Sequence, residues 1–140
     1  MRIYLAARYS RREELLGYAR ELEAMGHTIT ARWLQGSHQV SDDGLSEEAP
    51  AAQRQRFAEE DWEDLLGSEC CISFTEAPRV ANSRGGRHVE FGAAYHAGLL
   101  CLVVGPRENV FHCLEKVVWF PDWECARHAM QSARPEEAVA

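Results

Sequence analysis

The chain has 140 residues, 46% hydrophobic and 26% charged, which is typical of one globular domain with a buried core. Its 22 acidic and 15 basic side chains give a net charge of −7. This charge argues against binding to a nucleic-acid polymer, which needs a basic surface, but it is compatible with a small anionic ligand. The sequence has no apolar run of the ~20 residues that span a membrane, and its start does not resemble a secretion signal. We therefore expect a cytoplasmic protein with no membrane partner.

The cysteines and histidines do not form a pattern typical of a metal site. The five cysteines include no CxxC pair, and the six histidines are scattered without an HExxH motif. We expect no metal and no other cofactor. The cysteines, expected to be buried and reduced, are Cys70, Cys71, Cys101, Cys113 and Cys125.

The first half of the chain predicts strands that alternate with helices. An apolar run over residues 2–6 predicts a buried strand. Ser10 begins a capping-box pattern for a helix that Gly26 ends. The β-branched and aromatic run 27–34 predicts a second strand. The polar residues 35–49 predict a long loop, for which a lid over a site and an insertion without fixed structure both remain open.

The second half continues this alternation. The predicted elements are a helix over 50–68, a strand over 69–75, a loop over 76–86, a helix over 87–97, a strand over 99–104, a short helix over 110–115, a strand over 116–120 and a helix over 121–132. Residues 1–133 thus predict one α/β domain in three layers, in which a five-stranded, mostly parallel sheet of flavodoxin or Rossmann type carries helices on both faces. Residues 134–140 are expected to form a frayed tail. Ligands of such folds bind beyond the carboxyl ends of the strands.

Two acidic side chains fall on apolar faces of predicted helices. On a helical wheel, Asp61 and Glu90 both lie inside the predicted buried arcs. The arc around Asp61 comprises Phe57, Ala58, Trp62, Leu65 and Leu66. The arc around Glu90 comprises Val89, Ala93, Ala94 and Ala97. Because a buried carboxylate is costly unless it is paired, the two acids indicate either a shared site or two structural ion pairs with arginine.

The segment that opens the second of these helices carries glycines and arginines. Gly85 and Gly86 would expose N–H groups at the positive end of the helix, and Arg84 and Arg87 would add charge. The segment is not a P-loop, because no GK[ST] follows it. An anion site and a simple tight turn both fit it.

Four short motifs follow one another in a recognisable order: Tyr4–Ala7, Asp61–Leu65, Cys70–Pro78 and Gly85–Gly92. In this order they resemble the nucleoside 2-deoxyribosyltransferase superfamily and, within it, the 2'-deoxynucleoside 5'-phosphate N-hydrolase branch. The resemblance covers about residues 1–106. Its most specific part is the glycine-rich turn that leads into the glutamate of the last motif.

The resemblance implies a five-stranded parallel sheet and cleavage of the N-glycosidic bond of a (deoxy)nucleoside or its 5'-monophosphate. The base would be released to water, or the sugar transferred to another base. Glu90 matches the carboxylate that attacks or shields the anomeric carbon. Asp61 matches the acid that assists at the leaving base or the sugar, and Tyr4 the hydroxyl that holds the glutamate. The resemblance further implies a homodimer or higher homo-oligomer in which a neighbouring subunit completes the site from near Asn109.

The chain also departs from the family pattern. Arg8 stands where the nucleotide hydrolases have a serine, and Arg84 replaces a second serine. Arginines could bind a 5'-phosphate together with the turn over 85–87, or they could pair with the two acids. Trp33 could stack on the base, or it could be a core aromatic. The nature of the base and the sugar, the presence of a phosphate and the choice between hydrolysis and transfer all stay open.

Two other functions fit the same fold. One is a non-catalytic nucleotide-binding sensor, against which the presence of Glu90, Asp61 and Tyr4 argues. The other is a glycohydrolase that acts on a dinucleotide such as NAD, against which the absence of a dinucleotide fingerprint argues.

Overall fold

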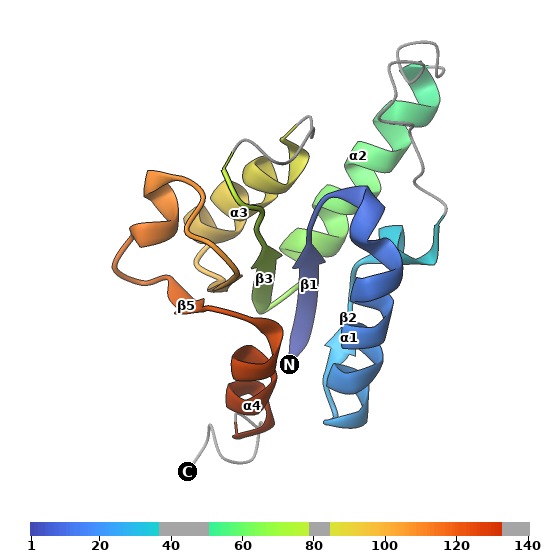
Figure 1. Ribbon diagram of the computed structural model, residues 1–140. Coiled ribbons are helices and arrows are strands. Elements are labelled where there is room, and N and C mark those ends of the chain that lie inside the picture. The colour runs from blue at the N-terminus through green and yellow to red at the C-terminus, as the bar shows by residue number, and fades with distance from the viewer. Residues whose placement is uncertain (37–50, 79–84, 133–140) are drawn as a thin grey trace.

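The computed structural model describes residues 1–36, 51–78 and 85–132. Within this part, five strands form one sheet in the order β2-β1-β3-β4-β5, and every neighbouring pair is parallel (Figure 1). The strands are β1 (Arg2–Ala6), β2 (Thr28–Ile29), β3 (Cys70–Phe74), β4 (Leu100–Val104) and β5 (Val118–Phe120). The predicted α/β fold with a five-stranded parallel sheet is thereby confirmed. The predicted loop from residue 37 on, Arg84 and the tail 134–140 lie outside the described residues.

Helices cover both faces of this sheet. The α-helices are α1 (Arg12–Ala24), α2 (Ala51–Leu66), α3 (Gly86–His96) and α4 (Trp123–Ser132), and the short 3-10 helices are η1 (Tyr9–Arg11), η2 (Arg32–Gln35) and η4 (Val110–Cys113). Tyr18 of α1 stacks on Trp123 of α4, with ring centroids 4.5 Å apart, so α1 and α4 share one face. Helices α2 and α3 contact each other on the opposite face. None of the described helices is both long and apolar enough to cross a membrane.

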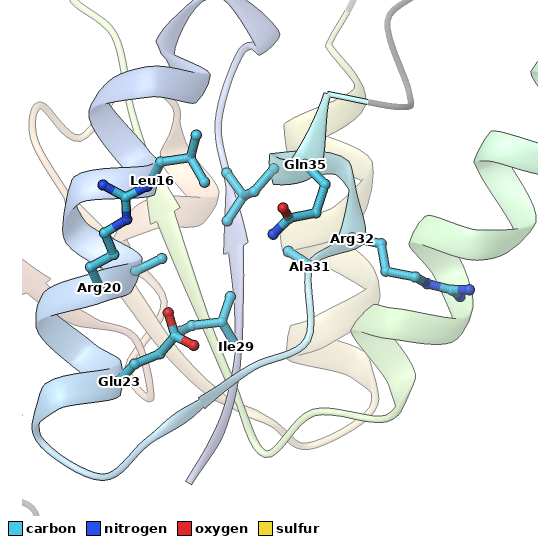
Figure 2. Close-up of a pocket in the computed structure, with 9 residues that line it drawn as sticks. Leu16, Arg20, Glu23, Ile29, Ala31, Arg32 and Gln35 are labelled. Atoms are coloured by element: carbon cyan, nitrogen blue, oxygen red, sulfur yellow. The ribbon is translucent and has the colours of Figure 1, made fainter.

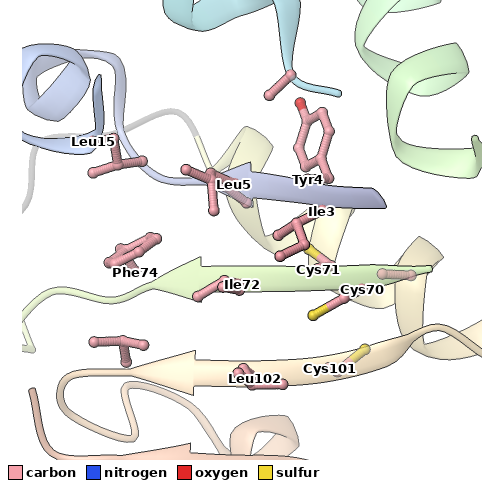
Figure 3. Close-up of a cluster of buried hydrophobic side chains, with 14 of the residues drawn as sticks. Ile3, Tyr4, Leu5, Leu15, Cys70, Cys71, Ile72, Phe74, Cys101 and Leu102 are labelled. Atoms are coloured by element: carbon pink, nitrogen blue, oxygen red, sulfur yellow. The ribbon is translucent and has the colours of Figure 1, made fainter. Parts of the chain in front are cut away.

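Side chains that alternate along the central strands pack against the helices on both faces of the sheet. Phe74 of β3 packs against Tyr18 on the α1 face, with ring centroids 5.4 Å apart. Cys71 lies an odd number of residues earlier in the same strand and therefore points to the α2 and α3 face, as does its register partner Tyr4. Both sets of side chains are buried (Figure 3). Each large apolar side chain that is buried contributes about 1.5–3 kcal/mol to stability.

The second strand is shorter than predicted. β2 comprises Thr28–Ile29 only, and residues 32–35 form η2 instead. The buried indole of Trp33 donates its N–H to the carbonyl of Leu5 at 2.9 Å, and the backbone N–H of Arg32 donates to Asp64 at 2.9 Å. These tertiary contacts turn the chain away from the sheet, although its β-branched and aromatic residues favour a strand.

Two further expectations are wrong in part. The N-cap of α1 is Arg11 and makes no side-chain capping bond, because Ser10 lies within η1 rather than at the cap. Gly26, with φ of 97°, does follow the end of α1 as predicted. Cys113 and Cys125 are exposed, since both lie in outer elements, whereas the three cysteines on β3 and β4 are buried.

The predicted buried arcs of α2 and α3 are also only partly correct. Phe57, Leu65 and Ala94 are buried. The side chains predicted as buried that are instead exposed are Ala58, Trp62, Leu66, Val89 and Ala97. Each helix packs on the sheet with a narrower stripe than the wheel predicts, and the N-terminal end of α2 projects beyond the strands (Figure 1).

Candidate active site

A direct hydrogen bond joins two of the predicted catalytic residues. The hydroxyl of Tyr4 donates to Oε2 of Glu90, across 86 residues of sequence. Tyr4 lies within β1 and is fully buried. Helix α3 packs on β1, so Glu90 reaches the phenol of Tyr4 from the face of the sheet that α2 and α3 cover. The strand therefore fixes the phenol, and the phenol fixes the orientation of the carboxylate.

Asp61 approaches this pair from the neighbouring helix. Its negative charge raises the pKa values of both Glu90 and Tyr4, so the three groups lie within electrostatic range of one another. Asp61 and Glu90 are each only partly buried. The fold thus brings the three predicted catalytic residues together on one face of the sheet.

Burial shifts the titration of all three groups toward their neutral forms. Loss of hydration raises the pKa of Glu90 to about 8, with Asp61 adding to the shift and the Tyr4 hydrogen bond opposing it. Burial raises the pKa of Asp61 to about 7. The pKa of Tyr4 is also raised, first by burial and then by the two carboxylates, so the phenol stays protonated. The carboxyl pair therefore retains a proton near neutral pH, which is what joint acid and base chemistry requires.

Arg87 is engaged in an internal ion pair. Its side chain is buried, its Nη2 lies 2.6 Å from Oε2 of Glu108, and its Nη1 contacts the other oxygen. Glu108 also accepts the backbone N–H of Glu76 at 3.2 Å. The pair fastens the start of α3 to the loop after β4. The predicted contact of Arg87 with a phosphate would require this pair to open.

Arg8 lies beyond the end of β1, beside the carboxylate of Glu76. Its Nη1 is 3.6 Å from Oε1 of Glu76, and Arg11 binds the other oxygen of that carboxylate at 2.7 Å. Gly85 adopts the left-handed conformation, with φ of 86°, and Gly86 begins α3. The glycine turn and Arg8 thus lie beyond strand ends as predicted, whereas Arg84 lies outside the described residues.

Two other predicted site residues have structural partners. Trp33 is 5% exposed, with its ring 6.0 Å from that of Tyr9, so it lies in the core and offers no free face for stacking. Asn109 caps η4 by accepting the backbone N–H of Phe111 at 2.9 Å. It lines a hollow of about 260 Å³ between α3 and η4, with His88, Phe91, Gly92, Tyr95, Phe111 and Leu114. This hollow is on the flank of α3 that faces η4.

An ion pair that no sequence pattern predicted lies beside Asp61. The side chain of Asp64 is only 10% exposed and binds the guanidinium of Arg32. Figure 2 shows Arg32 extending from η2 toward α2, at the border of a hollow of about 310 Å³ between α1 and the β2–η2 segment. The spacing of three residues between Asp61 and Asp64, which puts both on one helix face, was the available signal.

Comparison with solved structures finds similar folds, among them the following two. One is a 2-deoxyribosyltransferase from Bacillus psychrosaccharolyticus, with a TM-score of 0.68 and 17% identity over 91% of this chain and 90% of that one. The other is the CMP N-glycosidase BcmB from Clostridium botulinum, with a TM-score of 0.60 and 16% identity over 93% of this chain and 98% of that one. No family model matches the sequence, and no curated protein matches it. At these identities the likeness concerns architecture, and the chain has the fold of a 2-deoxyribosyltransferase and of a nucleotide N-glycosidase.

Proposed function

We propose that this protein cleaves the N-glycosidic bond of a (deoxy)nucleoside or its 5'-monophosphate, with Glu90 as the nucleophile. The observation that carries the proposal is the hydrogen bond from buried Tyr4 to Glu90, with Asp61 in electrostatic range of both. The activities named for the two proteins of like fold, deoxyribosyl transfer and CMP N-glycosidase activity, agree with this chemistry.

The reaction has two steps in this proposal. A carboxylate oxygen of Glu90 bonds to C1' of the sugar while the C1'–N bond breaks, and the base leaves with that electron pair and takes a proton from Asp61. In hydrolysis, a water oxygen then attacks C1', Glu90 departs as a carboxylate, and the proton of the water passes to Asp61. In transfer, a second base attacks C1' in place of the water.

The contacts around the two carboxyls suit these different roles. Glu90 must be ionised, and the hydroxyl of Tyr4 favours its ionised form by donating to it. Asp61 must be protonated, and burial raises its pKa to about 7. In the free site the pKa of Glu90, about 8, lies above that of Asp61, about 7, so the proposal requires the bound substrate to move the shared proton onto Asp61.

A 5'-phosphate would bind at the start of α3 in this proposal. Gly85 and Gly86 lie at the N-terminal, positive end of the α3 dipole, and Arg8 lies beyond the neighbouring strand end. Arg84 belongs to the same proposal on the sequence alone. Free nucleosides would then bind more weakly than their monophosphates.

The test is to incubate the full chain with a panel of nucleosides and 5'-monophosphates, with and without a second free base, and to identify products by mass. We expect base release, and a loss of about 10³-fold or more in the Glu90→Gln variant. Glu13→Gln, the same change at an exposed position of α1, should leave the rate unaltered. Nucleotide binding with no base released from any compound would instead indicate a sensor.

A further inference from the structure

We propose that Arg32 and Asp64 form a positioning pair that holds Asp61 in place and, through their opposite charges, sets the pH range in which it can act. The inference deepens the proposed function and rests on it in assigning the proton of Asp61 to the leaving base. Arg32 lies outside the four motifs that carry the family resemblance, and the resemblance assigns no role to Asp64, which lies within the second motif.

The pair is a two-point contact between η2 and α2. The backbone N–H of Arg32 donates to Oδ2 of Asp64 at 2.9 Å, and its Nε donates to Oδ1 at 2.9 Å and to Oδ2 at 3.1 Å. Its Nη2 also lies 3.4 Å from the carbonyl of Glu60. The side chain of Asp64 is 10% exposed and that of Arg32 is 47% exposed, so the contact closes over the carboxylate and leaves the guanidinium partly hydrated.

A second contact next to the pair makes the attachment rigid. Ser68 donates from Oγ to the carbonyl of Asp64 at 2.8 Å, and the same Oγ lies 2.6 Å from Oγ1 of Thr30. Arg32 therefore binds the last turns of α2, and Thr30 binds Ser68 just beyond the helix end. Because Asp61 precedes Asp64 by three residues, it lies on the helix face that these contacts hold.

The titratable and charged groups around Asp61 come from four elements. Asp64 and Glu60 on α2 disfavour its ionised form, whereas Arg32 on η2 favours it. Glu90 on α3 and Tyr4 on β1 face it from across the site. The two members of one ion pair thus act on Asp61 in opposite directions.

This opposition gives a test that a purely structural role does not satisfy. Arg32→Gln removes the cation and leaves Asp64 uncompensated, so the titration of Asp61 should move to higher pH. Asp64→Asn removes an anion and leaves Arg32 with only its longer contact to Glu63, at 3.8 Å, so the titration should move to lower pH. We expect each shift to be about half a pH unit or more in dilute salt, and smaller at high ionic strength.

Two readouts are needed, both on the full chain. The first is the side-chain carboxyl resonance of Asp61, followed by ¹³C NMR between pH 4 and 10 without substrate and assigned with Asp61→Asn. The second is the pH profile of kcat for base release, whose alkaline limb should follow the NMR shifts. Circular dichroism and the melting temperature establish that each variant is folded.

Two further variants separate charge from geometry. Arg32→Lys keeps the cation and the backbone N–H contact but loses the Nε hydrogen bonds to Asp64, so it should retain the titration of Asp61 while kcat falls. The double variant Arg32→Gln, Asp64→Asn removes both charges and should return the titration close to that of the parent protein, also with reduced kcat.

Shifts of Asp61 in the same direction in both single variants, or no shift in folded protein, would overturn the proposal. Opposite shifts by NMR support it. If the parent protein releases no base from any nucleoside while the NMR shifts are opposite, the proposed function fails and the electrostatic role of the pair stands.

Discussion

At the scale of single residues, the site depends on where one phenol is buried. Tyr4 is fully enclosed by β1 and its neighbours, and its hydroxyl donates to Glu90. Desolvation favours the neutral form of the carboxyl, whereas the donated hydrogen bond favours the charged form. The strand therefore supplies the interaction that keeps a half-buried glutamate able to ionise near neutral pH.

The first prediction concerns this hydrogen bond. Tyr4→Phe removes the donor, so the pKa of Glu90 should rise above about 8 and the acidic limb of the pH–rate profile should move to higher pH. At pH 7 we expect base release to fall by about tenfold, measured as kcat between pH 5 and 10. Tyr18→Phe is the control, because the hydroxyl of Tyr18 donates to Glu14 at 2.7 Å on the other face of the sheet. An unmoved acidic limb in Tyr4→Phe would contradict this role.

At the scale of elements, alternating apolar strands and amphipathic helices were enough to predict the fold. Strands buried on both faces are continuous apolar runs, which the sequence displays over residues 2–6 and 99–104. The β-branched and aromatic residues 27–34 also predict a strand, yet hydrogen bonds from Trp33 and Arg32 to other elements end β2 after Ile29. Such contacts join positions about thirty residues apart, and no local pattern encodes them.

The sequence indicates the candidate site to a similar extent as the fold. A helical wheel finds an acid on an apolar face, and in this way the sequence alone indicates Asp61 and Glu90. A wheel cannot find the partner of a charge, because that partner lies on another element. Arg87 was expected to bind an anion from outside, but its partner is Glu108 on the loop after β4.

The second prediction concerns this ion pair, which attaches the start of α3 to the loop after β4. Glu108→Gln should lower the free energy of unfolding by about 3 kcal/mol at pH 7, because it leaves the buried guanidinium of Arg87 without its counter-charge. The pKa of Glu108 is lowered in the folded protein despite burial, chiefly by Arg87. This stabilisation is therefore present above the unfolded pKa of a glutamate and is lost as the pH falls below it.

Urea unfolding at pH 7 and pH 3 measures this difference. Glu124→Gln is the matched control, because Glu124 pairs with Arg127 on the exposed side of α4 and should change stability by less than about 1 kcal/mol. Equal effects of the two variants at pH 7 would show that the buried pair does not fasten the helix.

At the scale of the whole molecule, the described surface has an apolar region at η4. Val110 and Phe111 are 74% and 61% exposed, and the hollow between α3 and η4 lies beside them. Monomeric proteins seldom expose large apolar side chains beside an apolar hollow. When two copies meet about a twofold axis, Val110 and Phe111 of each copy can enter the hollow of the other copy. The protruding side chains and the hollow of both copies are then buried.

The third prediction is a homodimer that forms through this region, with Asn109 at its border. Light scattering after size exclusion should give twice the chain mass at micromolar concentration, and Phe111→Ser should give the mass of one chain. Trp62→Ser, at a residue of α2 that is 48% exposed, should leave the dimer intact. If the second copy completes the site, base release by Phe111→Ser should fall together with the dimer and recover at high protein concentration. A parent protein of single-chain mass at 100 micromolar would contradict the interface, because about 8 kcal/mol of association free energy already suffices for a micromolar dimer.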